Sequence, residues 1–439
     1  MNEILNNITT TSNFLKTSDG RRLFENFMSL SILQVANYIL PLVTFPYLVR
    51  VLGPEKYGLI AFAQAFIGYF GILTDYGFNL SATREVSIYR GDREKISEIF
   101  SSVTIIKFAL MILSFVIFII LVFSFDKFRN DWRLYFLTFG SILGNVLFPV
   151  WLFQGMERMK YITFLNLLSK IIFTGAIFIF IRKSSDYLYV PGINLLGALI
   201  SGILALWIIF KNFKIKFILP SLEDIKHQLK EGWYIFISTV AISLYTVSNT
   251  FILGLFTNNT IVGYYSAAER LIKAVQGLLT PVSQTVYPYI SKLASESKER
   301  ALNVIRKLIM LVGGGTFFVS LLIFIFAAPI VNIILGAQYQ QSIIILRILA
   351  FLPFIIGLAT VYATLFLLGF GYSKVWSKII IISSLLDIVF IFIFVGLFSL
   401  AYIGVSISWV LTEVCVFLMS YLFYKKLYIP LGSKIHGYR

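Results

Sequence analysis

Residues 99–123 read IFSSVTIIKFALMILSFVIFIILVF and contain one charged side chain, Lys107. A helix rises about 1.5 Å per residue, so about 20 predominantly apolar residues cross the hydrocarbon core of a bilayer. The run is longer than this, and it is predicted to be a transmembrane helix. Lys107 lies close enough to the start of the run for its ammonium group to be expected at the membrane surface.

The composition of the whole chain is that of a membrane protein. Of its 439 residues, 58% are hydrophobic and 13% are charged, and the mean hydropathy is +0.85. Soluble domains carry about 25% charged residues, so this class is excluded. Twelve stretches are long and apolar enough to span a bilayer, which predicts an all-α integral membrane protein. They are 28–49, 59–80, 99–123, 134–153, 162–181, 191–210, 234–256, 264–290, 308–335, 343–370, 375–398 and 402–424.

Basic residues are distributed unevenly around these stretches. With the N-terminus in the cytoplasm, 24 of the 37 Lys and Arg residues lie in inner segments and 6 lie in outer loops. Because short cytoplasmic loops are enriched in Lys and Arg, both termini are predicted to be cytoplasmic. Topology and contact with anionic lipid thus explain most of the net charge of +16, which leaves little support for nucleic-acid binding.

The segment 211–232 divides the chain into two halves. It contains Pro220, and Ser221 with Asp224 form a capping-box pattern that predicts the start of an amphipathic helix. The expected domains are an N-terminal six-helix half at 1–215, a cytoplasmic linker with the amphipathic helix at 216–232, and a C-terminal six-helix half with a cytoplasmic tail at 233–439.

Six spans in each half predict a parallel repeat, with a pseudo-two-fold axis along the membrane normal. The internal similarity is weak. Gly58 begins the sequence GLIAFA and Gly263 begins GYYSAA, at an offset of 205 residues and at the same place in the span order. We therefore expect two six-helix bundles.

Three charged residues distinguish the span 264–290. Glu269, Arg270 and Lys273 lie near its start. On insertion scales, a charged side chain at the middle of a span costs about 2.5 to 3.5 kcal/mol. Such residues tend to face a bundle interior or a wet cavity, so we expect Glu269, Arg270 and Lys273 to belong to a substrate-binding site, with Arg270 and Lys273 in contact with the substrate. At 100° per residue, Gln276 falls on the same face as Glu269 and Lys273. Alternatively, Glu269 and Lys273 neutralise each other as an i,i+4 pair.

Polar residues recur in two further spans. Gln64 and Asp75 lie on one face of the span 59–80, and Tyr245 with Asn249 lie in the span 234–256. A shared central cavity would explain why several helices carry polar faces. For Asp75, ion coupling, an interhelical salt bridge and a gating contact are all open. The same roles are open for Asp387, Glu413 and Arg347.

Motifs for catalysis and cofactor binding are missing from the sequence. The chain has one cysteine, Cys415, and two histidines, so cysteine-rich and histidine-based metal sites are not expected. It contains no P-loop, H-E-x-x-H or G-x-S-x-G sequence. We expect no cofactor, no metal and no enzyme activity, and the wet cavity favours a secondary transporter. A drug/cation antiporter and a polytopic polysaccharide polymerase or ligase are the alternatives.

Three motifs resemble one family of transporters. Residues 149–160 read PVWLFQGMERMK, residues 52–58 read LGPEKYG and residues 263–270 read GYYSAAER. Together they resemble the Wzx polysaccharide flippases of the multidrug/oligosaccharidyl-lipid/polysaccharide exporter superfamily. The resemblance covers essentially the whole chain, and the span number agrees with it.

The resemblance implies two bundles that form a V around a central cavity. It also implies translocation of an undecaprenyl-diphosphate-linked oligosaccharide, an O-antigen or capsule repeat unit, from the cytoplasmic to the outer leaflet of the bacterial inner membrane by alternating access. The expected diphosphate contacts are Arg270 and Lys273, and Gln64, Gln276, Tyr245 and Asn249 would suit sugar hydroxyls. Membrane lipids, a polysaccharide polymerase and a chain-length regulator are the expected partners.

Overall fold

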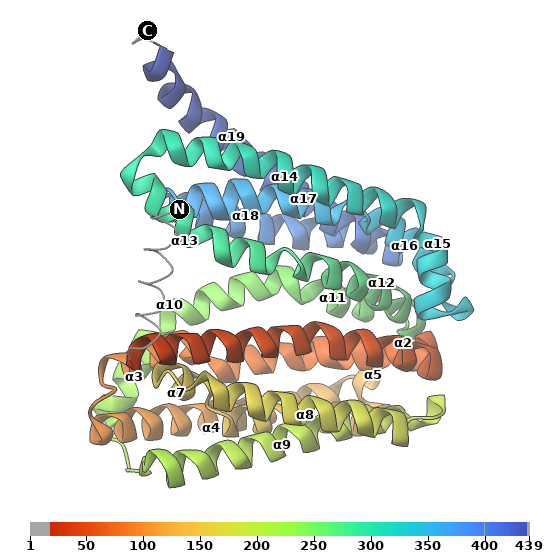
Figure 1. The fold of residues 1–439 in the computed structure, drawn as a ribbon. Helices are drawn as coiled ribbons and strands as arrows, with labels where there is room; N and C mark the ends of the chain where they lie inside the picture. Colours follow the sequence, from red (N-terminus) through yellow and green to blue (C-terminus); the bar gives the residue numbers. More distant parts are fainter. Residues whose placement is uncertain (1–17, 399, 437–439) are drawn as a thin grey trace. The chain divides into compact units, whose positions relative to one another are not determined.

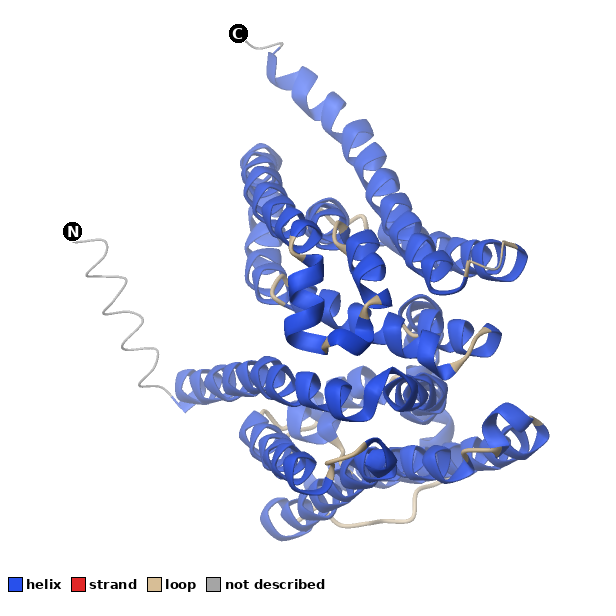
Figure 2. Ribbon diagram, turned by 90° about the vertical axis from the view of Figure 1, so that its right-hand side faces the viewer, coloured by secondary structure: helices blue, strands red, loops and turns tan. Residues whose placement is uncertain are grey.

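The computed structural model describes residues 18–398 and 400–436, which are almost entirely helical and include no strand (Figure 2). Contacts between residues divide the chain into two compact units. The first unit comprises Met1–Val51 and Phe66–Val240, and the second comprises Leu52–Ala65 and Ala241–Arg439. The short segment Leu52–Ala65 thus belongs by its contacts to the second unit, although it lies early in the sequence.

The helices of the first unit pack as an antiparallel series in which α9 contacts both α6 and α8 (Figure 1). Their bounds are α2 (Ser18–Asp75, shared with the second unit), α3 (Phe78–Ile88), α4 (Arg93–Ser124), α5 (Asp126–Arg129), α6 (Trp132–Leu147), α7 (Val150–Gly155), α8 (Met159–Phe180), η1 (Ser184–Leu188), α9 (Tyr189–Ile208), η2 (Ile209–Phe213) and α10 (Leu222–Thr246, whose last residues belong to the second unit).

In the second unit the long C-terminal helix α19 contacts α16, α17 and α18. The bounds are α11 (Ser248–Phe256), α12 (Asn259–Gly277), α13 (Thr280–Glu296), α14 (Lys298–Ile325), α15 (Ala327–Ile330), η3 (Val331–Leu335), η4 (Ala337–Tyr339), α16 (Gln341–Leu349), α17 (Leu352–Ala359), η5 (Thr360–Leu368), α18 (Ser373–Ile391), η6 (Phe392–Leu397) and α19 (Ala401–His436).

Nine helices in the described part of the chain are long and apolar enough to cross a membrane. The prediction from residues 99–123 is confirmed, because they lie in the candidate span Arg93–Ser124, whose most apolar window has a mean hydropathy of 3.0. Ile112 and Leu113 in this helix are 60% and 50% exposed, as expected of side chains that face lipid. The chain is therefore a multi-pass helical membrane protein.

Helix α2 changes direction at Gly53, where φ is 71° and ψ is 171°. A residue with a Cβ atom rarely adopts this backbone conformation, so glycine permits the bend. The bend separates the predicted spans 28–49 and 59–80, both of which lie within α2. Most side chains of 28–49 lie outside the described part of the structure.

The two glycines of the internal sequence similarity meet inside the second unit. A Cβ atom built on Gly58 would lie 2.4 Å from the backbone nitrogen of Gly263, and one built on Gly263 would lie 1.9 Å from the carbonyl oxygen of Pro54. Only hydrogen fits at either position. Close backbone approach at small residues is typical of helix packing in membranes, and it fixes Leu52–Ala65 against the start of α12.

Several predicted spans are divided between two or more helices, and two of these breaks lie in spans that carry candidate site residues. The stretch 234–256 is divided at Val247, between α10 and α11, and 264–290 is divided at Leu278 and Leu279, between α12 and α13. Pro281 lies in the first turn of α13 and has no backbone N–H group to donate to α12. The second break therefore has a local cause in the sequence.

The tryptophan-containing motif lies on the short helix α7, which packs against α3. Trp151 and Phe153 are 1% and 0% exposed. At the end of the motif, the Arg90 side chain donates from Nε to the carbonyl oxygen of Gly155 at 3.0 Å and forms an ion pair with Glu157 at 2.7 Å. In this chain these residues hold helices together, so the motif has a structural role.

The amphipathic helix predicted at Ser221 is present as the first part of α10. The Ser221 hydroxyl accepts from the backbone nitrogen of Asp224 at 3.1 Å, and the Asp224 carboxylate accepts from the backbone nitrogen of Ser221 at 3.0 Å. The Ser221 hydroxyl also donates to Oδ2 of Asp224 at 2.7 Å, and this bond is the main cause of the lowered pKa of Asp224. The capping box is thus confirmed as the start of α10.

Candidate functional site

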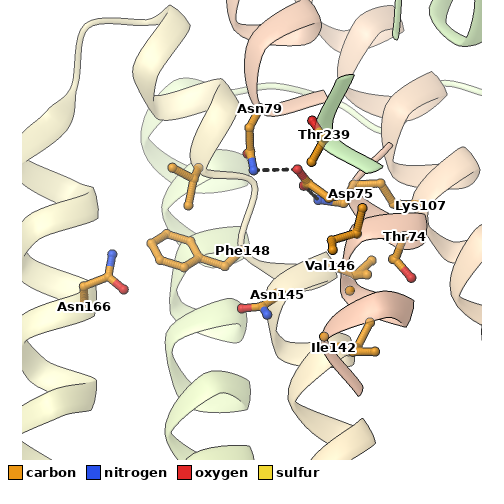
Figure 3. A pocket seen from close by; sticks show the side chains of 14 residues that line it. Thr74, Asp75, Asn79, Lys107, Ile142, Asn145, Val146, Phe148, Asn166 and Thr239 are labelled. Atoms are coloured by element: carbon orange, nitrogen blue, oxygen red, sulfur yellow. Dashed lines mark hydrogen bonds and ion pairs between the residues drawn. The ribbon is translucent and has the colours of Figure 1, made fainter. Parts of the chain in front are cut away.

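A polar cavity of about 410 Å³ lies within the first unit (Figure 3). Helices α2, α3, α4, α6, α8 and α10 all contribute to its wall. Its polar lining residues are Thr74, Asp75, Asn79, Lys107, Asn145, Asn166 and Thr239. Of the two residues named on the polar face of the span 59–80, Asp75 lines this cavity, whereas Gln64 lies in the segment Leu52–Ala65 of the second unit.

An ion pair occupies one side of this cavity. The Nζ atom of Lys107 lies 3.0 Å from Oδ1 of Asp75, and Nδ2 of Asn79 donates to Oδ2 of the same carboxylate at 2.8 Å. The Lys107 side chain is 7% exposed and that of Asp75 is 32% exposed. The expectation that Lys107 reaches the membrane surface is wrong, because its ammonium group is held inside the unit by Asp75.

Uncharged amides and hydroxyls form the rest of the polar lining. Nδ2 of Asn166 donates to the carbonyl oxygen of Ile162, and the Thr239 hydroxyl donates to the carbonyl oxygen of Ile235. Asn145 is exposed, and among the described residues its amide has no hydrogen-bond partner. These groups retain acceptor or donor capacity toward the cavity.

A second polar cluster surrounds Glu269 in the second unit. Glu269 is 8% exposed, its Oε1 lies 2.9 Å from Nζ of Lys273, and its Oε2 accepts from the Thr250 hydroxyl at 3.1 Å. Nζ of Lys273 also lies 5.8 Å from the centre of the Trp409 ring. Glu269 and Lys273 thus form the i,i+4 pair that the sequence allowed, and the Lys273 side chain is still 47% exposed.

Arg270 lies on a different side of α12. Its side chain is exposed and interacts with the hydroxyl group of Tyr57, a residue of Leu52–Ala65 that is itself 6% exposed. The close approach of Gly58 and Gly263 brings these two segments together. Arg270 therefore presents a guanidinium group at the surface of the second unit, positioned by Tyr57.

The other predicted sugar contacts have separate surroundings. Asn249 is 3% exposed and lies beside Thr250 at the start of α11, and Gln64 is exposed on α2. Gln276 is half-buried, and its Nε2 atom has no partner among the described residues. The side chain of Tyr245 lies outside the described part of the structure. The polar face of the span 264–290 follows α12 only as far as Gln276, because α12 ends one residue later.

Asp387 and Glu413 are buried in the second unit, at 0% and 6% exposure. Oδ1 of Asp387 accepts from the Thr412 hydroxyl at 2.9 Å, so α18 and α19 are joined at this point. Asp387 therefore joins the two helices through a hydroxyl group and not through the interhelical salt bridge that was one of its open roles.

Several cavity residues were not identified from the sequence. Asn145 and Asn166 are isolated amides in apolar spans, and Thr239 lies on α10, which begins at the capping box of Ser221. No periodic pattern distinguishes them from amides that join helices. The one available signal was the single charge in 99–123, since a lone lysine within a span indicates a buried acidic partner.

Comparison with known proteins identifies similar sequences over nearly the full length. A family model described as polysaccharide biosynthesis protein matches residues 23–294. A putative O-antigen transporter of Escherichia coli K12 is 35% identical over 394 residues, which cover 89% of this chain and 94% of that protein. A putative O-antigen transporter of Shigella dysenteriae is 29% identical and covers 90% of this chain and 98% of its own.

Solved structures of two transporter types share the fold. A multidrug resistance MATE family transporter of the MOP superfamily, in an inward-facing conformation, has a TM-score of 0.66 at 16% identity and covers 93% of this chain and 99% of its own. The lipid II flippase MurJ, in an inward closed conformation, has a TM-score of 0.68 at 18% identity, with coverage of 92% and 87%. At these identities the likeness concerns the fold alone.

Proposed function

This chain belongs to the polysaccharide biosynthesis protein family, and from that membership we propose that it is a flippase for a lipid-linked oligosaccharide. Its substrate would be an O-antigen or capsule repeat unit on undecaprenyl diphosphate, moved from the cytoplasmic to the outer leaflet of the inner membrane. The similar sequences named O-antigen transporters support this class of substrate.

The exposed cations of α12 are the observation that carries the proposal. A diphosphate bears negative charge and several acceptor oxygens, and a guanidinium group can bind two of them at once. Because Glu269 already pairs with Lys273, Arg270 is the main anion contact and Lys273 is a weaker one. Glu269 then positions Lys273 and does not contact the substrate itself.

The proposed topology follows the sequence analysis. It has twelve spans in two six-helix halves, at 1–215 and 233–439, with cytoplasmic termini and a pseudo-two-fold repeat, and it works by alternating access. Export of a finished repeat unit also predicts functional partnership with a polymerase and a chain-length regulator. Asp75 stays a candidate for ion coupling, and full export by Asp75→Asn across imposed ion gradients would exclude it.

The test is polymer export in a strain that lacks its own flippase. Arg270→Ala should reduce surface polymer at least tenfold, and Lys273→Ala should have a smaller effect, because removing a charge-assisted hydrogen bond costs about 1.5 to 3 kcal/mol. Lys292→Ala is the matched control, since Lys292 forms an exposed i,i+4 pair with Glu296 on α13. Membrane levels of each variant are measured by immunoblot. Unchanged export in both single variants and in the double variant would refute the proposed role of α12.

A further inference from the structure

We propose that the cavity of the first unit is a binding site for the uncharged sugar residues of the lipid-linked substrate. This inference rests on the proposed function, and it adds a site that is distinct from the cations of α12. It also assigns sugar recognition to Asn145, Asn166 and Thr239, which the sequence analysis did not consider.

The charge of the cavity favours a neutral ligand. Among its described lining residues, Asp75 and Lys107 are the only two that carry charge, and they form an ion pair at 3.0 Å. A diphosphate entering here would have to separate Lys107 from its partner and would meet the Asp75 carboxylate, which is repulsive at short range. An organic cation would meet the opposite problem at Lys107. A neutral ligand requires neither change.

The hydrogen-bonding groups match hydroxyl groups. Each sugar hydroxyl both donates and accepts, and a carboxamide offers both functions side by side. Asn145 has its whole amide available, and Asn166 uses its Nδ2 within α8, which leaves Oδ1 as an acceptor. The Asp75 carboxylate is 32% exposed and can accept further hydrogen bonds beyond those from Lys107 and Asn79.

The apolar part of the wall suits the carbon face of a sugar ring. Ile142, Val146 and Phe148 line the cavity next to the amides (Figure 3). A cavity of about 410 Å³ also falls within the range of roughly 300 to 1,000 Å³ that is typical of small-ligand sites. A mixture of apolar wall and few convergent polar groups is what such sites require.

Glycine on α2 keeps the cavity open. No atom lies within 4 Å of the position that a Cβ atom on Gly71 would occupy, so a longer side chain there would extend into free space. Gly71→Leu should therefore fill part of the cavity without disturbing the helices. Gly175 on α8 has equally free surroundings, is exposed and does not line the cavity. Gly175→Leu is thus a matched control for the same substitution in a helix.

The experiment compares two probes on purified full-length protein in lipid nanodiscs. One probe is undecaprenyl diphosphate, and the other is the lipid-linked oligosaccharide extracted from cells in which this transporter has been deleted. We expect the wild type to bind the sugar-bearing lipid at least tenfold more tightly than the bare lipid. Gly71→Leu should abolish that preference, Asn145→Leu should reduce it about threefold to tenfold, and Gly175→Leu should retain it.

Affinity for the bare lipid separates the possible failures. If it is unchanged within about twofold in Gly71→Leu and Asn145→Leu, these variants are folded and the loss is specific to the sugars. Retention of the wild-type preference by both variants would overturn the cavity proposal and leave the flippase proposal standing. If the wild type binds neither lipid, the flippase proposal fails and the cavity proposal falls with it.

Discussion

Breaking the ion pair of the first unit should lower the stability of the protein by different amounts, depending on whether Asp75 or Lys107 is replaced. At 3.0 Å and an effective dielectric constant of about 20, the attraction between Lys107 and Asp75 is about 5.5 kcal/mol before desolvation is subtracted. Removing one partner of a buried pair typically costs about 3 to 5 kcal/mol, because the other charge is left uncompensated. The cost here depends on which charge remains.

Asp75→Asn leaves a lysine that is 7% exposed, so we expect nearly the full loss of about 3 to 5 kcal/mol. Lys107→Met leaves a carboxylate that is 32% exposed and hydrogen-bonded by Asn79, so water and the amide reduce the loss to about 1 to 3 kcal/mol. In the double variant no charge remains, and the stability should return to near the wild-type value.

The assay measures the apparent melting temperature of the detergent-solubilised protein. Samples are heated, and the fraction that stays folded is measured by size-exclusion chromatography. At roughly 2 to 4 °C per kcal/mol, Asp75→Asn should melt on the order of 10 °C below the wild type, and Lys107→Met only a few degrees below it. The four proteins form a double-mutant cycle. The reasoning is refuted if Lys107→Met is the less stable single variant, or if the double variant shows the sum of the two single losses.

Three further predictions concern packing and capping. Gly263→Ala should lower the yield of folded protein severely, because its Cβ atom would lie 1.9 Å from a backbone oxygen, whereas Gly314→Ala has free space and should be neutral in the same chromatographic assay. Ser221→Ala should cost about 1 kcal/mol through the lost cap, visible as a lower melting temperature. The pKa of Asp224 is lowered in the folded state, so Asp224→Asn should destabilise the protein at pH 7. The loss of stability should fade as the pH falls below about 3.9, the ordinary pKa of aspartate. A loss of stability that does not depend on pH would contradict this.

The sequence predicted the helical membrane fold well, because hydropathy over about 20 residues reports directly on burial in lipid. It also predicted the capping box at Ser221, since that motif is local. The breaks after Gly277 and at Val247 were missed, because an apolar composition persists through them. Pro281 was a usable signal for the break after Gly277. Prolines are tolerated within membrane helices, however, and do not by themselves predict a break.

In the candidate sites, contacts between residues close in sequence could be predicted, whereas contacts between distant residues could not. Glu269 and Lys273 are four residues apart, so their pairing could be anticipated from helical geometry. Lys107 and Asp75 are far apart in sequence, and only the packing of α4 against α2 brings them together. Asn145 and Asn166 belong to the same class, since their shared cavity depends on tertiary contacts that no local pattern encodes.

The contact between Gly58 and Gly263 also constrains how the protein is made. The two residues are 205 positions apart, and translation proceeds at about 5 to 20 residues per second, so Gly58 must wait about 10 to 40 s for its partner to be synthesised. During that interval the segment Leu52–Ala65 lacks the helices against which it finally packs. Completion of the second unit is therefore a late step of biogenesis, and a ribosome that stalls before α12 would leave the beginning of the chain with an unfilled helix surface in the bilayer.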